Sequence, residues 1–295
     1  MTIAPDLATV AAPGVGQPRN PVPPGACDTH SHVFGPFDRF TPHHPSVYAL
    51  PEADPRTHQA ARERLGMARG VLIQPAPYGT DPAAMLAAIA QSDGALKGIA
   101  VADQGIAPCE LERWAMGGVA GLRFSDMRAP GGQPYPGSVG FAALAALAPQ
   151  MRDLGLHAQL WAAPENLLEH LPALLRLQVP IVLDHMAMLN PVLAQTNGLL
   201  DRLIPLVAGE DIWVKLVLCR VERADLTGGE AIRAIHEQLL AVRPERMLWG
   251  SDWPYVRLEP APDAAVMLDL FASWAGSEQV IRQVLVDNPA TLFNF

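Results

Sequence analysis

The chain has 295 residues, of which 49% are hydrophobic and 17% charged, a composition typical of one large folded domain. Its formal net charge of -9 argues against a general attraction to nucleic acid or to an anionic membrane surface. No apolar stretch approaches the roughly 18 residues that a membrane-spanning helix needs. Three widely spaced cysteines predict no disulfide framework and favour the cytoplasm. The sequence is compatible with a homo-oligomer.

The chain begins with a segment rich in Pro, Ala and Gly, residues 1–24, whose lack of periodicity predicts a flexible arm. Residues 25–295 then alternate short apolar runs with segments whose apolar residues recur every three or four positions. The expected strands are Cys27–Val33, Gly70–Ala76, Lys97–Asp103, Ala120–Ser125, His157–Trp161, Pro180–His185, Ile212–Val217 and Arg246–Asp252. The expected helices are Pro82–Gln91, Gly140–Leu154, Glu165–Leu177, Pro191–Val207, Gly229–Val242 and Pro262–Trp274, followed by a short last helix with Asn288 as N-cap.

Eight strand–helix alternations without a break in composition predict a single-domain α/β protein, a (β/α)8 TIM barrel. A doubly wound open sheet is the alternative, but no Gly-x-Gly-x-x-Gly turn follows the first strand. In such barrels the active site lies at the C-terminal ends of the strands. Polar residues at those ends are therefore the candidates for chemistry.

Three of the expected strands end in imidazole or carboxylate side chains. The first ends in Asp-Thr-His-Ser-His, where the two-residue period of a strand puts His30 and His32 on one face. The sixth strand ends at His185 and the eighth reaches Asp252. A His-x-His pair only suggests a metal site, and a single histidine at a strand end is more often structural. Together they predict one site built by three strands.

Neighbouring charged residues have structural interpretations. We expect Asp28 and Asp184 to cap or tether the backbone. Lys215, on the seventh strand, is expected to form a structural ion pair.

The strand-end motifs resemble the amidohydrolase superfamily, and within it a branch of lactone-processing enzymes typified by 2-pyrone-4,6-dicarboxylate hydrolase. The resemblance runs from Cys27 to Phe295 and includes Gly-Leu-Arg-Phe at 121–124 and Trp-Gly-Ser-Asp-Trp-Pro at 249–254. It implies hydrolysis of a small carboxylate-bearing lactone, with Asp252 as the general base that activates water. His30, His32 and His185 would polarise the lactone carbonyl and stabilise the oxyanion.

The resemblance also implies how many metal ions the site would hold. Metal-dependent members carry a histidine on the fifth strand and a lysine or glutamate on the fourth, where this chain has Gln159 and Arg123. A binuclear centre is therefore not expected. A metal-free site is favoured by the likeness to the dicarboxylate hydrolases. One divalent ion, most readily zinc, on His30, His32 and Asp252, with or without His185, is the alternative.

Arginines after the fourth and seventh strands predict an acidic substrate, because guanidinium groups bind carboxylates through paired hydrogen bonds. The candidates are Arg123, Arg128, Arg220 and Arg223, with surface ion pairing an equal alternative for the last two. The resemblance adds Tyr48, and Tyr78 is a further candidate after the second strand. Two positions differ from the dicarboxylate hydrolases: Ala76 stands where they have a small hydroxyl residue, and Trp161 stands where they have a tyrosine. Trp161 is also a candidate for contact with the substrate. We therefore expect a different substrate, with one acidic group fewer.

Two other functions fit the same residues. Lactone isomerisation or decarboxylation would use the same scaffold, and it differs from hydrolysis in whether solvent oxygen enters the product. A catalytically silent protein that binds a lactone or sugar acid is the third hypothesis. The intact set of Asp252 and three histidines argues against it.

Overall fold

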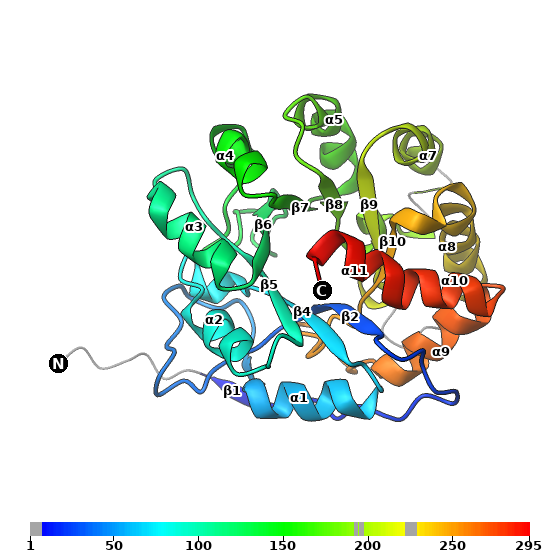
Figure 1. The fold of residues 1–295 in the computed structure, drawn as a ribbon, viewed down its shortest axis with the longest axis horizontal. Coiled ribbons are helices and arrows are strands. Elements are labelled where there is room, and N and C mark those ends of the chain that lie inside the picture. The colour runs from blue at the N-terminus through cyan, green and yellow to red at the C-terminus, as the bar shows by residue number, and fades with distance from the viewer. Residues whose placement is uncertain (1–7, 192–193, 195–197, 222–228) are drawn as a thin grey trace.

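Eight parallel strands form one sheet with the order β2, β4, β5, β6, β7, β8, β9, β10, as the computed structural model shows for residues 8–191, 194, 198–221 and 229–295. Figure 1 shows the helices arranged around this sheet. The strands are β2 (Cys27–Ser31), β4 (Arg69–Ile73), β5 (Leu96–Ala100), β6 (Val119–Ser125), β7 (His157–Trp161), β8 (Ile181–Leu183), β9 (Ile212–Leu216) and β10 (Met247–Trp249). The predicted α/β fold, a (β/α)8 barrel, is confirmed.

The ring closes between β2 and β10. The Asp252 amide donates to the His30 carbonyl at 2.7 Å, and the His32 amide donates to the Trp253 carbonyl at 2.9 Å. A parallel bridge joins Ser31 to Trp253 between them. The residues that close the barrel are thus the neighbours of those expected to carry its chemistry.

The helices of the outer layer include two that the sequence did not predict, α1 and α3. In α1 the apolar residues are too few to show a helical period, and only His58 is buried; α3 is short and buries Leu111 and Trp114, three residues apart. The helices are α1 (Pro55–Arg64), α2 (Ala83–Ala90), α3 (Pro108–Met116), α4 (Phe141–Asp153), α5 (Pro164–Leu175), α7 (Leu199–Gly209), α8 (Gly229–Val242), α9 (Ala264–Trp274), α10 (Glu278–Arg282) and α11 (Asn288–Phe293). Within the predicted helix Pro191–Val207, residues 192–193 and 195–197 lie outside the described part of the chain.

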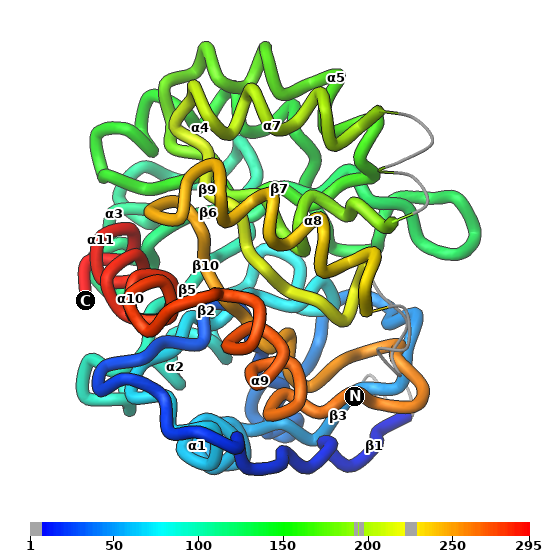
Figure 2. Tube along the Cα trace, turned by 90° about the vertical axis from the view of Figure 1, so that its right-hand side faces the viewer, coloured from blue at the N-terminus to red at the C-terminus, as the bar shows by residue number. Residues whose placement is uncertain are grey.

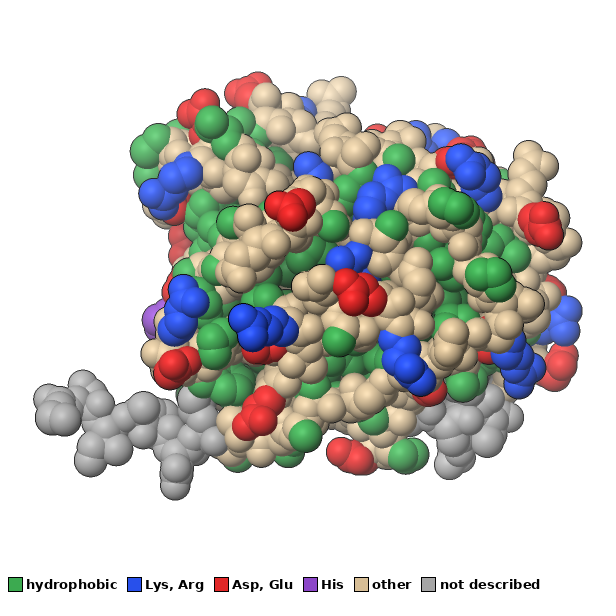
Figure 3. All heavy atoms as spheres, turned by 60° about the horizontal axis from the view of Figure 1, so that its bottom comes forward, with side chains coloured by type: hydrophobic (Ala, Val, Ile, Leu, Met, Phe, Trp, Pro, Cys, Tyr) green, Lys and Arg blue, Asp and Glu red, His purple; other side chains and the backbone are tan. Residues whose placement is uncertain are grey.

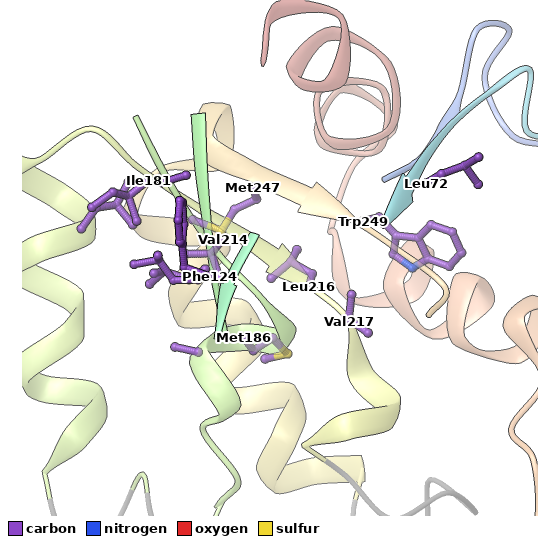
Figure 4. Packing of buried hydrophobic residues seen from close by; sticks show 14 of the residues in the cluster. Leu72, Phe124, Ile181, Met186, Val214, Leu216, Val217, Met247 and Trp249 are labelled. Atoms are coloured by element: carbon purple, nitrogen blue, oxygen red, sulfur yellow. The ribbon is translucent and has the colours of Figure 1, made fainter. Parts of the chain in front are cut away.

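The core has two parts because successive strand residues face opposite sides of the sheet. The outward faces pack against the helices, as Figure 4 shows for Leu72, Phe124 and Trp249. The inward faces at the base of the barrel form a second cluster that includes Trp213 and Leu248. Phe293 of α11 joins this inner cluster, so the last helix plugs the base.

Asn288 is not the N-cap that the sequence predicts. A π-helical turn, η5 (Gln283–Asp287), joins α10 to α11 without interruption, so Asn288 has helical dihedral angles. Its side-chain amide donates instead to the backbone carbonyls of Pro244 and Met247, both at 2.7 Å. These bonds fasten the C-terminal helix to the start of β10. Figure 2 shows α10 and α11 together at one end of the molecule.

The N-terminal segment was expected to be a flexible arm over residues 1–24. From residue 8 onward it lies against the barrel, where β1 (Thr9–Ala11) pairs in parallel with β3 (Leu50–Glu52). The Trp253 indole nitrogen donates to the Pro13 carbonyl at 2.9 Å, and the Gly16 amide donates to Asp263 at 3.0 Å. The described part of the segment is therefore attached at several points.

On the surface, acidic and basic side chains are intermixed over the face drawn in Figure 3. Among the described residues, no helix has both the length and the apolar character that crossing a membrane requires.

Candidate active site

Four side chains from the carboxyl ends of β2, β8 and β10 meet at one point. Nε2 of His30 and Nε2 of His32 each lie 3.4 Å from Oδ1 of Asp252. Nε2 of His185 lies 3.5 Å from the same oxygen. All four side chains are buried. The structure thus brings together the four residues that the sequence singles out as catalytic.

Local backbone geometry places Asp252 and His185 in this cluster. Both have left-handed backbone, with φ of 61° for Asp252 and 50° for His185. Such non-glycine residues cost of order 1–3 kcal/mol and persist where the surrounding structure holds them, often at functional sites. Gly250 allows β10 to approach β2, because a Cβ atom there would lie 2.6 Å from Cβ of His30.

Asp28 ties the ends of β2 and β10 together, which confirms its predicted tethering role. Its carboxylate accepts hydrogen bonds from the Ser251 amide at 2.9 Å, the His30 amide at 3.1 Å and the Ser251 hydroxyl at 2.5 Å. Burial raises the pKa of Asp28 to about 6, although the Ser251 bonds oppose this shift. The tether holds the histidine-bearing strand beside the strand that leads to Asp252.

Arg220 holds the second oxygen of Asp252. Its Nε donates to Oδ2, and its Nη1 donates to the Val256 carbonyl at 2.8 Å. Burial acts to raise the pKa of Asp252, but the Arg220 charge and the neighbouring His185 and His32 outweigh it and hold the pKa well below its usual range. Burial lowers the pKa of His30 and of His185. At neutral pH the site therefore contains an ionised carboxylate facing the neutral imidazoles of His30 and His185.

A second carboxylate, Asp184, lies beneath the cluster. Arg123 contacts its Oδ2 through Nε at 3.0 Å and Nη2 at 2.9 Å. Its Oδ1 lies 3.3 Å from Nδ1 of His30 and 3.9 Å from Nζ of Lys215. Burial acts to raise the pKa of Asp184, yet Arg123 and His30 hold it well below its usual range. The prediction that Asp184 caps or tethers the backbone is wrong, because its side chain points into the barrel and binds side chains.

Lys215 is completely buried and forms the structural pairing expected of it. Its ammonium donates to the Thr29 carbonyl and to Oε1 of Gln159, both at 2.7 Å. Burial lowers the pKa of Lys215 to about 8, although Asp184 opposes the shift. Gln159, on the strand where metal-dependent relatives carry a histidine, is thereby engaged by the lysine.

A pocket opens over the cluster. Four of the predicted substrate-binding residues line it together with Asp252: Arg123, Arg220, Tyr48 and Trp161. Burial raises the pKa of the Tyr48 phenol, so this residue presents a neutral hydroxyl. The Arg123 guanidinium lies over the Trp161 ring at 4.7 Å.

Two other predicted contacts, Arg128 and Tyr78, are described by the structure but do not line the pocket. Arg128 is exposed, because a backbone bridge to Pro134 folds its segment into a small hairpin. Tyr78 is buried, and its hydroxyl accepts a hydrogen bond from the Gly35 amide at 2.8 Å. Arg223 lies outside the described residues.

Two polar residues that line the pocket were missed by the sequence analysis. Tyr135 lies in the loop after β6, and Arg257 lies in the loop after β10. Neither belongs to a periodic segment, so no pattern assigns its side chain to a face. Their positions after strands four and eight were the one available signal, since loops at the carboxyl ends of barrel strands build the active site.

The donor set at this site fits one divalent cation. Ligand atoms of His30, His32 and Asp252 all lie within 4.8 Å of one another. Nδ1 of His32 lies 2.7 Å from the Ile73 carbonyl, which can only accept, so in the neutral ring the Nε2 lone pair is free. Nε2 of His30 is buried and has no hydrogen-bond partner among the described residues. Two imidazoles and one carboxylate are a ligand set that zinc accepts.

The chain matches the family model described as Amidohydrolase over residues 27–295. It is 30% identical to a 4-sulfomuconolactone hydrolase of Rhizobium radiobacter over 277 residues, 92% of this chain and 91% of the relative. It is 28% identical to a 2-pyrone-4,6-dicarboxylate hydrolase of Comamonas testosteroni, covering 94% and 92% of the two chains. A D-galactarolactone isomerase of Agrobacterium fabrum is 27% identical, with 94% of each chain covered.

A crystal structure from Agrobacterium tumefaciens has the same fold. It superposes with a TM-score of 0.79 at 24% identity, and the match covers 94% of this chain and 98% of the other.

Proposed function

This chain is an enzyme of the amidohydrolase family, and we propose that it hydrolyses the ring ester of a small carboxylate-bearing lactone. One observation carries the proposal: a single oxygen of Asp252 lies within 3.5 Å of three imidazole nitrogens at the mouth of the barrel. Hydrolysis of an ester needs a base for water on one side of the carbonyl and hydrogen-bond donors where negative charge develops. The pocket offers both.

Asp252 is the proposed base. Its low pKa keeps it ionised, and Oδ1 faces the pocket while Arg220 holds Oδ2. A water molecule that donates a hydrogen bond to Oδ1 would lose that proton as its oxygen attacks the lactone carbonyl. The proton would pass to Asp252, and the ring oxygen would then leave with it.

The histidines are proposed to stabilise the oxyanion, and the geometry makes His185 a better hydrogen-bond donor than His32. The Nδ1 proton of His32 is used by the Ile73 carbonyl, so His32 can donate from Nε2 only when its ring is doubly protonated. Neither ring nitrogen of His185 has a hydrogen-bond partner among the described residues. His185 is therefore the imidazole best placed to donate to the carbonyl oxygen as charge develops on it.

If one divalent ion is bound, His30, His32 and Asp252 would hold it, and it would supply Lewis-acid stabilisation of the developing charge. The base and donor roles of Asp252 and His185 are proposed with or without it. The acidic group of the substrate would lie in the part of the pocket lined by arginines. Three free cysteines agree with our proposal that the enzyme works in the cytoplasm.

The test is a screen of carboxylated lactones in water enriched in oxygen-18, with enzyme depleted of metal by chelation and with the same enzyme loaded with zinc. Hydrolysis puts one solvent oxygen into the new carboxylate. Turnover without incorporation of solvent oxygen would instead support isomerisation, the second candidate, which the similarity to the galactarolactone isomerase favours. Absence of any turnover in both metal states would contradict the proposal.

A further inference from the structure

One wall of the pocket contains cationic and aromatic groups that the proposed hydrolysis does not use. The Arg257 guanidinium lies over the Tyr135 ring, 5.5 Å from its centroid. The Tyr135 ring lies 5.2 Å from the Trp161 ring at an angle of 38°. Arg123 lies over the other ring of the pair, Trp161. We refer to these four residues, Arg257, Tyr135, Trp161 and Arg123, as the aromatic wall.

The three arginines that line the pocket differ in their partners. Arg123 is paired with Asp184 and Arg220 with Asp252, so each guanidinium is neutralised by a buried carboxylate. Within residues 8–191, 194, 198–221 and 229–295, Arg257 has no acidic partner. Among the described residues that line the pocket, Arg257 is therefore the cation best placed to bind an anionic group of a substrate.

The aromatic wall also contains hydrogen-bonding groups without partners. The Tyr135 hydroxyl and the Trp161 indole nitrogen are buried, and neither has a hydrogen-bond partner in the described part of the chain. A buried donor without an acceptor is energetically unfavourable. Both residues line the pocket, so a substrate that brings an acceptor would relieve this cost.

The backbone that carries Arg257 is attached to the catalytic cluster. Arg220 donates to the Val256 carbonyl while it holds Asp252, and the Leu258 amide donates to the Tyr255 carbonyl at 3.0 Å. This turn therefore has a set position relative to the carboxylate. Arg257 and the proposed base lie at different places around the same pocket.

We propose that Arg257 and Tyr135 bind the acidic group of the substrate, and that the substrate is a lactone with a single carboxylate. The inference rests on the proposed lactone hydrolysis and adds its substrate class. Because one guanidinium of the pocket lacks a carboxylate partner among the described residues, we infer that the pocket accommodates one acidic group. That group lies against the aromatic wall while the ring ester faces Asp252.

The experiment compares γ-butyrolactone-γ-carboxylate with its neutral carboxamide on wild type, Arg257→Gln and Tyr135→Phe. Arg39→Gln is the matched control, because Arg39 is exposed, lies over the Phe40 ring at 5.2 Å and does not line the pocket. We expect Arg257→Gln to raise KM for the acid by about tenfold or more and to leave the carboxamide unchanged. Tyr135→Phe should act in the same direction by about threefold. Arg39→Gln should change neither compound.

Calorimetric binding of the acid to each variant accompanies the kinetics, so the anion site is measured even without turnover. Equal effects of Arg257→Gln on acid and carboxamide, or no effect on either, would overturn the inference. Tighter binding of a dicarboxylate analogue than of the monocarboxylate would also overturn it. Wild type that binds the acid in an Arg257-dependent manner but opens no lactone would refute the proposed hydrolysis while leaving the anion site in place.

Discussion

Two walls of the same pocket differ in how their polar groups are satisfied. The catalytic wall, made of His30, His32, His185, Asp252 and Arg220, comes from the ends of β2, β8 and β10 and from the turn after β9. Its residues contact one another, with three imidazoles and a guanidinium around one carboxylate. The aromatic wall depends largely on the loops after β6 and β10, and its hydroxyl and indole groups have no partners among the described residues.

This difference suits the two walls to two tasks, chemistry and selection of the substrate. Residues at strand ends are held by the sheet, so they suit chemistry that needs distances defined to a fraction of an ångström. Loop residues tolerate substitution without loss of the barrel, so they suit the selection of a substrate. Changes on the catalytic wall should therefore affect kcat for every substrate, and changes at the two loop residues of the aromatic wall, Tyr135 and Arg257, should affect KM for acidic ones.

The largest effect is expected from Asp252→Asn, which removes the proposed base and keeps the size of the side chain. We expect kcat to fall by about 10²- to 10⁴-fold for acidic and neutral lactones alike. The variant should still fold, with a lowered melting temperature because Arg220 loses its carboxylate partner. Asp81→Asn removes a carboxylate that forms an exposed pair with His43 at 2.8 Å and serves as the control. Retained turnover in Asp252→Asn would refute the assignment of the base.

Asp184→Asn tests the buried support of the catalytic wall. It leaves Arg123 and Lys215 without their carboxylate, so we expect the free energy of unfolding to fall by about 3–5 kcal/mol. At a temperature where the variant is still folded, kcat should fall as well, because His30 loses its neighbour at 3.3 Å. The matched control is Asp211→Asn, which breaks a surface pair with Arg246 worth at most about 1 kcal/mol. Similar losses of stability in both variants would contradict the supporting role.

Arg220→Gln should change the pH dependence of the reaction. The Arg220 charge lowers the pKa of Asp252, so its removal raises that pKa. The base works only when ionised, and activity is lost as pH falls through its pKa. We therefore expect the acidic limb of kcat/KM to move to higher pH, whereas Arg128→Gln, on an exposed arginine, should leave it in place. An acidic limb that does not move would show that Arg220 does not control the ionisation of the base.

The smallest effect is expected from Arg123→Lys on the aromatic wall. Lysine keeps the charge but cannot make both contacts to Asp184, and its cation packs less well over Trp161. We expect about a threefold loss in kcat/KM that is the same for the acid and its carboxamide. A loss confined to the acid would make Arg123 an anion contact, as the sequence suggests, and would weaken the contrast between strand residues and loop residues.

Much of the barrel could be derived from the sequence because the patterns that define it are local. The period of two places His30 and His32 on one face, and apolar runs of four to eight residues mark buried parallel strands. Every barrel strand begins within one residue of its predicted start. Since the barrel rule locates chemistry at the ends of strands, the four residues of the cluster follow from the same patterns.

Local patterns failed where a side chain's role depends on a distant part of the chain. Asp184 was assigned to the backbone, yet its partners are Arg123, His30 and Lys215 from three other strands. Asn288 has the sequence of a helix cap, yet η5 makes the helix continuous and turns the amide toward β10.

The amino-acid sequence alone determined the strands, their parity and the polar residues at their ends, because spacing along a strand sets the direction of each side chain. The tertiary structure decided which charges pair, which tyrosines reach the pocket and which pocket arginine has no carboxylate partner among the described residues. Arg220 and Arg257 each follow the C-terminal end of a barrel strand in the sequence, but of these two only Arg220 lies against Asp252. Ion pairing depends on distances between residues far apart in the chain, and closure of the barrel sets those distances.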